Sequence, residues 1–496
     1  MRQKYLKYNI LSALSYQFAN VACGFILPRY ILLYFGSEVN GLTISITSFL
    51  GLISYLELGM TSVVESSLYK PLAEKDYNCV SKVVASARRF FRRIGMVFFL
   101  YVFALILIFP KLINSNFGFL FTATLILSIS IGSFAKYFFG ISDLIVLVAD
   151  QKAFVANVLQ IILIVLNTIL CIIVIKLGFS IQLVKLTTSI VFLAAPIYYR
   201  YYVNRHHRID RKIKYSGEPI KQKWNGIAQH VAAIVLGGTD SVVLTVFSSL
   251  NNVSIYGVYL LVINGLERIF ISATSGFQSY FGNLWANEEH EQLFITFDRL
   301  VWMVHTGVVF VFGCTAVLIV PFVQVYTSGI HDVSYNVPKF ALLITFAYAV
   351  YCLRLPFNLM VLAAGHYIQT QNSYIISAAL NIIISVIAVK KWGLVGVAIG
   401  TLIAMLYQTI YLGIYNSKYL VCWPMKRFIK QIIINIVSFV PAYTFTRGFC
   451  LTETTYVGWA LLAMKVAIGW LIWIGICNSI FYRNHIINLV KAFQKR

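Results

Sequence analysis

The segment Phe35–Leu72, FGSEVNGLTISITSFLGLISYLELGMTSVVESSLYKPL, decides the fold. It leaves one membrane face through two glycines, continues as a long apolar stretch that carries Glu57 and Glu65, and ends in a basic region. About 20 apolar residues are enough for a helix to cross roughly 30 Å of hydrocarbon. The sequence therefore predicts a membrane-spanning helix over residues 41–65.

A weaker copy of this segment follows later in the chain. Asn9 and Gly41 match Asn225 and Gly257 at one fixed offset, and Leu68 matches Leu284 at the same offset. Three further pairs match only if the offset shrinks slightly: Asn167 with Asn381, Gly178 with Gly393, and Thr188 with Thr401. A repeat of this length predicts a duplicated bundle. Six spans per half is an even number, so both halves start on the same side and the repeat is parallel.

The composition identifies the class of protein. Of 496 residues, 59% are hydrophobic and only 11% are charged, whereas soluble domains contain about 25% charged residues. Long apolar stretches recur along the whole chain, which favours helices over barrel strands. About fourteen spans are expected, near residues 9–34, 41–65, 94–112, 117–140, 154–176, 180–199, 226–249, 253–281, 300–326, 339–363, 370–389, 394–415, 429–446 and 458–481.

The predicted fold is an all-α polytopic membrane protein with two six-helix lobes and two additional C-terminal helices. The N-lobe comprises residues 1–204, a basic linker residues 205–222 and the C-lobe residues 223–416. Residues 417–496 hold the last two helices and a tail.

Membrane topology explains the net charge of +23 better than nucleic-acid binding does, because Lys and Arg lie mostly between the spans. By the positive-inside rule both termini and the linker are expected in the cytoplasm. Two basic clusters stand out, Arg88–Arg93 and the linker from Arg200 to Trp224. Their simplest role is orientation and contact with anionic lipid, and attraction of an anionic lipid-linked substrate is a second possibility. Eight scattered cysteines without a histidine cluster argue against a metal site or a disulfide framework.

Arginines at membrane depth are candidates for substrate binding, since ionisable groups there usually mark a pathway. Arg29 follows Pro28 and Arg354 precedes Pro356, and proline interrupts regular helical hydrogen bonding. Arginine donates two parallel hydrogen bonds and keeps its charge when desolvated, so it suits a diphosphate. The alternative for Arg29 is an interfacial position from which the side chain reaches the headgroups.

A polar stripe surrounds a third arginine, Arg268. Asn264, Ser272 and Ser275 share its helix face at i−4, i+4 and i+7. The stripe is expected to face an aqueous cavity, and a helix–helix contact through small polar residues is the alternative.

Two acids in apolar helices, Asp240 and Glu57, are candidates for ion coupling by a proton or a sodium ion. A static ion pair with one of the arginines explains them equally well. Four other ionisable residues are weaker candidates: Glu65, Glu267, Lys136 and Lys465.

Enzyme activity is not expected, and we assign no catalytic residue, metal or cofactor. The loops on the outer side are short, the longest being 327–338 and 447–457. A glycosyltransferase or polymerase of lipid-linked sugars usually needs a larger polar loop.

Three motifs carry a family resemblance: the segment from Leu33 to Asp76, ADQK at Ala149–Lys152, and GLVGVAIGT at Gly393–Thr401. The chain resembles the bacterial lipid-linked oligosaccharide flippases of O-antigen and capsule biosynthesis (Wzx type). These belong to the multidrug/oligosaccharidyl-lipid/polysaccharide (MOP) exporter superfamily, together with the MATE drug exporters and the lipid II flippase. The first motif is specific to the polysaccharide branch, and GLVGVAIGT is shared more widely.

The resemblance implies a cationic cavity between the two lobes. Undecaprenyl diphosphate-linked oligosaccharide would enter it from the cytoplasmic side of the bacterial inner membrane and leave on the outer side by alternating access. Membrane lipids, glycosyltransferases and a polymerase are the implied partners. Two alternatives remain: a MATE-like exporter of cations or drugs, and a membrane enzyme of lipid-linked polysaccharide assembly. The absence of an acid in the first span disfavours the exporter.

Overall fold

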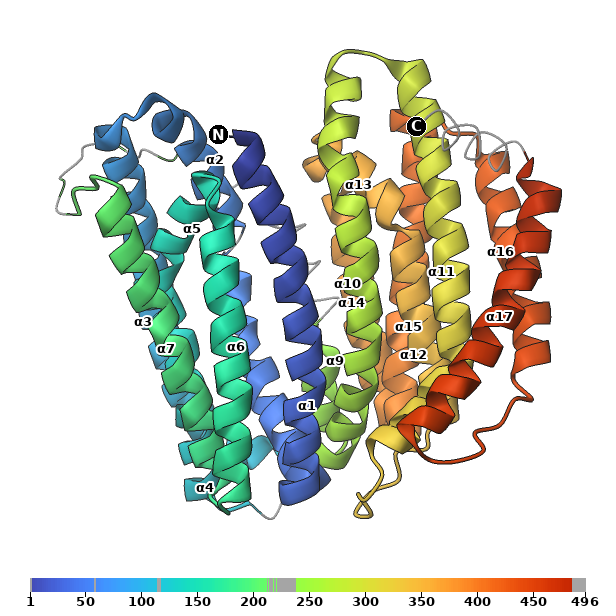
Figure 1. Cartoon of the computed structure of the whole chain (residues 1–496), viewed down its shortest axis with the longest axis horizontal. Helices are drawn as coiled ribbons and strands as arrows, with labels where there is room; N and C mark the ends of the chain where they lie inside the picture. The colour runs from blue at the N-terminus through green and yellow to red at the C-terminus, as the bar shows by residue number, and fades with distance from the viewer. Residues whose placement is uncertain are drawn as a thin grey trace. The chain divides into compact units, whose positions relative to one another are not determined.

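The computed structural model describes residues 2–57, 59–113, 117–211, 213, 217, 220 and 238–483, and every regular element within them is a helix (Figure 1). The first part contains α1 (Arg2–Gly51), η1 (Leu52–Glu57), α2 (Met60–Glu74), α3 (Tyr77–Leu112), α4 (Phe119–Ala135), η2 (Lys136–Gly140), α5 (Ile141–Ala149), α6 (Ala153–Lys176) and α7 (Ile181–His206). The second contains α9 (Asp240–Phe247), α10 (Leu250–Ala286), α11 (His290–Tyr326), α12 (Pro338–Leu353), α13 (Leu355–Ala363), α14 (Tyr367–Trp392), α15 (Leu394–Tyr415), η3 (Asn416–Leu420), α16 (Met425–Thr446) and α17 (Tyr456–Phe481).

The chain forms two compact units. Unit 1 comprises Met1–Ile234 with Ser249–Ser254, and unit 2 comprises Val235–Ser248 with Ile255–Arg496. Eight of the eighteen residues of the predicted linker 205–222 and half of the predicted span 226–249 lie outside the described residues, as do the repeat position Asn225 and the C-terminal tail after residue 483.

Twelve of the described helices are long and apolar enough to cross a membrane. The first of these, Lys7–Glu57, is 51 residues long and corresponds to two predicted spans. Within it Gly36 has φ 82° and ψ 174°, a conformation that only glycine adopts readily. Figure 1 shows the start of α1 and helix α2 at the same end of unit 1, so the chain reverses in this stretch. With this reversal, the twelve candidates correspond to thirteen of the fourteen predicted spans. Of the predicted span 226–249 the structure describes residues 238–249, which contain α9.

The second span of unit 1 differs from the expected single helix. It passes through the 3-10 helix η1, and Gly59 follows with φ 69°. Its counterpart α10 in unit 2 runs as one α-helix of 37 residues. The residue that corresponds to Gly59 is Ser275, which has no comparable freedom to adopt a positive φ. Glu57 therefore lies at an irregular position of the backbone.

Several helices extend beyond the predicted spans. Helix α3 begins at Tyr77, whereas the predicted span begins at residue 94, and α11 begins at His290, whereas the predicted span begins at residue 300. Hydropathy detects only the part of a helix that crosses hydrocarbon. Polar turns that continue into the headgroup region carry no such signal.

Close packing of α14 on α15 forms the central contact of unit 2. A Cβ at Gly396 would lie 2.4 Å from the backbone carbonyl of Ala388, and one at Gly400 would lie 2.2 Å from Ser385 Oγ. Small residues of this kind let two membrane helices approach closely. The motif GLVGVAIGT is thus explained by packing.

We expect Gly396→Ala to disrupt this contact, because the added methyl group overlaps backbone atoms that cannot rotate away. Overpacking of this kind costs about 1–3 kcal/mol, so the yield and melting temperature of purified protein should fall. The matched control is Gly475→Ala, where a Cβ meets no atom within 4 Å. Equal melting temperatures for the two variants would contradict the packing account.

The last two helices pack on α11. Trp470 of α17 is fully buried among α11 and α16 side chains that include Leu318 and Ala442, and its Nε1 donates to Thr446 Oγ1 at 3.1 Å. Two polar contacts join the same helices: His305 Nδ1 lies 2.9 Å from Asn435 Nδ2, and Trp302 Nε1 donates to Asn478 Oδ1 at 2.8 Å. The pair is therefore a firmly attached part of unit 2.

Matching hydrogen bonds occur in the two units and support the internal repeat. In unit 1, Cys171 Sγ donates to the carbonyl of Val184 at 3.5 Å. In unit 2, Ser385 Oγ donates to the carbonyl of Val397 at 3.4 Å. Both donors lie four residues after a repeat asparagine, Asn167 and Asn381 respectively.

The end of unit 1 that contains the N-terminus is held together by polar contacts. Asn9 Nδ2 donates to the carbonyl of Gln151 at 2.8 Å. Asp150 is paired with Lys152 Nζ at 2.8 Å and with His207 Nε2 at 3.3 Å. Burial alone would raise the pKa of the Asp150 carboxyl, but its contacts with His207 and Lys152 outweigh burial and hold the pKa below its ordinary value.

The lowered pKa predicts how stability depends on pH. Asp150 stabilises the fold fully at pH values above the ordinary carboxyl pKa of about 4. This stabilisation is lost as the pH falls through the lowered pKa of the folded protein. Asp150→Asn should therefore cost about 1 kcal/mol at pH 7 and progressively less as the pH is lowered toward about 3. Thermal unfolding of both proteins across this pH range measures the difference, and a gap that does not narrow on acidification would contradict the assignment.

Candidate functional site

Arg354 lies at the break between α12 and α13. Pro356 occupies the first turn of α13, where its missing N–H and fixed φ favour the start of a new helix. The Arg354 N–H is shared between the carbonyls of Val350 and Tyr351, both at 3.2 Å. The predicted interruption of the helix at Arg354 is thus present.

The Arg354 guanidinium is buried without a full set of hydrogen bonds. The residue is 6% exposed, its Cζ lies 4.7 Å from the centroid of the Tyr351 ring, and Nη1 has no hydrogen-bond partner. Buried donors are normally paired, and leaving one unmade costs about 1–3 kcal/mol or more for a charged group. A buried guanidinium with an unused donor is suited to binding an anionic group.

Glu267 of α10 is an acid that interacts electrostatically with Arg354. Its carboxyl lies within hydrogen-bonding reach of the Tyr351 hydroxyl and in the electrostatic field of Arg268 and Arg354. From the sequence alone Glu267 is a weaker candidate, because Arg268 is its neighbour in the chain. In the structure its carboxyl also interacts with Arg354, which lies 87 positions later in the sequence.

Unit 1 contains a related arrangement. Glu57 accepts a hydrogen bond from Tyr137 at 2.6 Å and lies 3.9 Å from Lys136 Nζ. Lys136 and Tyr137 begin the π-helix η2, which interrupts α4–α5 at the repeat position of the α12–α13 break. Each unit thus combines an acid, a tyrosine and a basic residue at an irregular turn. The basic residue is the buried Arg354 in unit 2 and the largely exposed Lys136 in unit 1. For Glu57, the ion pair is with Lys136, a partner that the sequence alone did not suggest.

Asp240 lies in a fully buried polar cluster at the start of α9. Its carboxyl accepts hydrogen bonds from Thr401 at 2.7 Å, Tyr256 at 2.8 Å and Asn381 at 3.4 Å. Thr239 donates to Asn381 Oδ1 at 3.1 Å, and Thr401 Oγ1 lies 3.1 Å from the carbonyl oxygen of Val397. Four helices, α9, α10, α14 and α15, contribute to this cluster of oxygen atoms.

No Lys, Arg or His of the described residues is among the groups that act on the Asp240 carboxyl. A buried carboxylate without a cationic partner is costly, and among the described residues Asp240 is compensated by hydrogen-bond donors alone. The repeat position in unit 1 is Gly24, where a Cβ would meet no atom within 4 Å. The acid is therefore present in unit 2 and not at the equivalent site of unit 1.

A row of tyrosines connects the two buried sites of unit 2. Tyr256, which binds Asp240, has the Tyr348 hydroxyl as its next polar neighbour. Tyr348 in turn lies in the field of Glu267 and Tyr351. Electrostatic interactions of these tyrosines thus link the surroundings of Asp240 with those of Arg354.

The stripe around Arg268 lies on an uncovered face of α10. Arg268, Ser272 and Ser275 are exposed and Asn264 is half-buried. Ser275 Oγ donates to the carbonyl of Ser272 at 3.0 Å. The role of this stripe in substrate binding stays a prediction.

Arg29 differs from the expectation of an interrupted helix. Pro28 lies inside α1, whose only non-helical residue is Gly36, and the Arg29 side chain is half-buried. Proline removes one hydrogen bond, which a membrane helix tolerates with local adjustment. The backbone here is regular, and the substrate-binding role of Arg29 stays a prediction.

Sequence reasoning did not assign a role to several residues of these clusters. Tyr256, Tyr348 and Tyr351 were hidden among the many aromatics of the chain. Asn381 and Thr401 were noticed as repeat positions but not as partners of Asp240. The signal that could have identified them is that both are polar residues at repeat positions, Asn381 in the span before GLVGVAIGT and Thr401 at the end of that motif.

No protein-family model matches this sequence, and no curated protein matches it. Solved structures do match it. The lipid II flippase MurJ in an inward closed conformation superposes with a TM-score of 0.68 at 18% identity, covering 96% of this chain and 100% of that one. The fold is that of MurJ and the MATE transporters. An inward-facing MATE multidrug resistance transporter of the MOP superfamily gives 0.62 at 15% identity, covering 81% of this chain and 94% of that one. The MATE transporter VcmN of Vibrio cholerae in the bent form gives 0.54 at 13% identity, covering 83% and 94%.

The extent of these matches bears on the last two helices. A match over 96% of the chain leaves too few residues outside it to omit both α16 and α17. The MATE match over 81% of the chain leaves enough residues unmatched to omit both helices. The predicted all-α fold of the MOP type is confirmed.

Proposed function

We propose that the protein is a flippase for undecaprenyl diphosphate-linked oligosaccharides in the bacterial inner membrane. Alternating access would expose Arg354, with Arg268 and Arg29, first to the cytoplasmic and then to the outer side. The observation that carries the proposal is the buried Arg354 guanidinium with its unused Nη1 donor.

The chemistry of Arg354 supports a diphosphate as the bound group. A guanidinium binds phosphate oxygens with two parallel hydrogen bonds and remains charged when water is excluded. Glu267 and Tyr351 lie beside it and balance part of its charge when no substrate is bound. An arriving diphosphate would compete with Glu267 for Arg354, so binding and release remain reversible.

The MurJ-like fold supports a lipid-linked substrate. MurJ is by its name a flippase of lipid II, and it covers more of this chain than the MATE structures do. In this account the oligosaccharide is made by glycosyltransferases on one side and used by a polymerase on the other.

Ion coupling is part of the proposal and is assigned to Asp240. A proton or a sodium ion would neutralise its carboxylate, and the oxygens of Asp240 itself, of the Thr401 hydroxyl and of the Val397 carbonyl are suitable ligands for a hard cation. Asn381 directs its Nδ2 toward the carboxyl and would not be a ligand in this arrangement. The tyrosine row from Tyr256 to Tyr351 would transmit the change in charge to Arg354. Glu57 is a less suitable carrier, because it already pairs with Lys136 and accepts a hydrogen bond from Tyr137.

Transport by the purified chain in proteoliposomes tests the function. We expect a lipid-linked oligosaccharide diphosphate to move between leaflets at least about tenfold faster than in protein-free vesicles, as read by a membrane-impermeant lectin or glycosidase. Lipophilic cationic dyes serve as the competing substrate. Dye export without lipid movement would contradict the flippase proposal and favour a MATE-like exporter, and net formation of longer glycans would favour an enzyme.

A further inference from the structure

Four arginines of unit 1 gather at the end that contains the N-terminus. Arg88 and Arg92 come from the first half of α3, Arg200 from α7 and Arg211 from the segment after α7. All three others act electrostatically on Arg88, and Asp143 acts on it with the opposite sign. The cluster therefore brings together four cations around one carboxylate.

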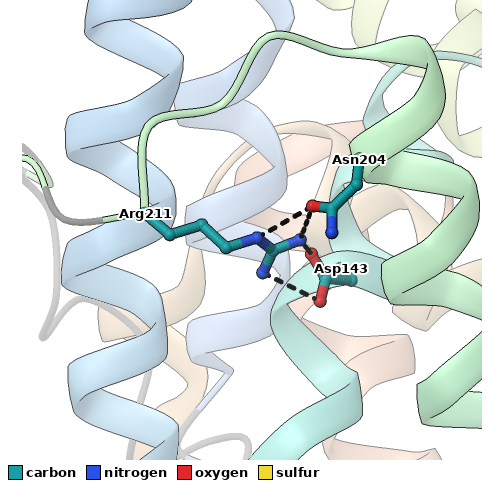
Figure 2. A network of polar contacts seen from close by, with 3 residues as sticks. All are labelled: Asp143, Asn204 and Arg211. Atoms are coloured by element: carbon teal, nitrogen blue, oxygen red, sulfur yellow. Dashed lines mark hydrogen bonds and ion pairs between the residues drawn. The ribbon is translucent and has the colours of Figure 1, made fainter.

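Asp143 is already engaged by one of the four. Figure 2 shows Arg211 reaching Asp143 of α5 with both of its terminal nitrogens, at 2.8 and 3.2 Å. Asn204 Oδ1 accepts from Nε and Nη2 of the same guanidinium at 3.0 and 2.8 Å. Asp143 and Arg211 are 1% and 14% exposed. This clamp fixes Arg211 and uses the oxygens of Asp143.

The position of Arg211 is fixed by the backbone as well. The N–H of Asp210 donates to Ser81 Oγ of α3 at 2.9 Å, and His207 pairs with Asp150 at 3.3 Å. The segment after α7 is thus attached to α3 and to the end of α5. The cluster is held by the fold of unit 1 and does not depend on flexible side chains alone.

Arg92 contributes a buried donor that the protein itself does not use. Its guanidinium lies over the Phe138 ring at 5.1 Å from the centroid, and its Nε is buried without a hydrogen-bond partner. Orientation of the protein by basic residues requires neither a fixed cluster nor a buried donor. A group that brings negative charge and several acceptor oxygens would satisfy both the charge and the donor.

We propose that Arg88, Arg92 and Arg200, arranged by the Arg211–Asp143 clamp, bind the phosphate group of an anionic phospholipid at this end of unit 1. A headgroup phosphate lies at the membrane surface, where basic pockets between helices bind such lipids. The inference is independent of the proposed flippase activity, because it concerns retention of a lipid and needs no transport.

Lipid retention by the purified full chain tests the proposal. The protein is exchanged into detergent with phosphatidylglycerol or phosphatidylcholine, and bound lipid is measured by native mass spectrometry. We expect selective retention of phosphatidylglycerol by the wild type and about a tenfold or greater loss in Arg88→Gln/Arg92→Gln. Arg88→Lys/Arg92→Lys keeps the charge that orients the chain but loses the forked hydrogen bonding, so its retention should be intermediate.

The matched control is Arg89→Gln/Arg93→Gln. It removes the same charge from the same turns of α3, at exposed positions that are not among the groups acting on Arg88. Retention close to wild type in the control supports a specific site. Equal losses in both double variants would overturn the proposal in favour of general surface charge. Displacement of the lipid by a soluble prenyl diphosphate at equal or lower concentration would also overturn it, since the site would then serve the substrate.

Discussion

Arg354→Gln is expected to lower lipid transport by roughly 10- to 100-fold, because hydrogen bonds to a charged group contribute about 1.5–3 kcal/mol each. The side chain is 6% exposed and one of its nitrogens is unpaired. Glu267 keeps Arg268 as an electrostatic partner when Arg354 is removed, so no unpaired buried charge is left that would destabilise the fold. We therefore expect a melting temperature close to that of the wild type, measured in the same detergent.

Two variants sharpen the test of Arg354. Arg354→Lys retains the charge without the forked geometry, so transport should fall less than in Arg354→Gln. Arg447→Gln removes an exposed arginine after α16 and should leave transport unchanged. Wild-type transport by Arg354→Gln would show that this guanidinium does not bind the substrate, whereas an unfolded variant would point to a structural role.

Asp240→Asn is expected to abolish the response of transport to an imposed ion gradient. Asparagine can keep contacts with Tyr256 and Thr401 but can neither release a proton nor supply a carboxylate to sodium. Because the buried charge is removed, the protein should be at least as stable as the wild type. Proteoliposomes with a sodium gradient, a pH gradient or neither measure the response and distinguish the two ions.

The matched variant for coupling is Glu57→Gln. Glu57 already has Lys136 and Tyr137 as partners, so its substitution should leave the gradient response in place. A response that survives in Asp240→Asn and disappears in Glu57→Gln would reverse the assignment and place coupling in unit 1.

Much of the fold could be predicted from the sequence because hydrocarbon imposes a length on each helix. Thirteen of the fourteen predicted spans, the final two included, correspond to helices of the described residues that are long enough to cross a membrane. The irregular backbone was harder to predict. Gly36 and Gly59 adopt positive φ, but neither glycine differs in hydropathy from one in a regular helix, and Pro28 leaves α1 helical while Pro356 starts a new helix.

The candidate site could be predicted only in part. Arg354, Asp240 and Glu57 are conspicuous as charges in apolar helices. Their partners are not, because Tyr351, Tyr256 and Tyr137 resemble the other aromatics of a chain that is 15% aromatic. The contacts of Asp240 join α9 to α15 across 161 residues, and no local pattern indicates such a contact. Figure 2 illustrates the same point for Arg211 and Asp143, which lie 68 positions apart.

The most direct test of the central claim is the affinity of the purified protein for a short-chain prenyl diphosphate, compared with the corresponding monophosphate. We predict at least about tenfold tighter binding of the diphosphate by the wild type, and loss of that preference in Arg354→Gln. Equal affinities for the two compounds, or a preference that survives in Arg354→Gln, would contradict recognition of a lipid diphosphate by this arginine.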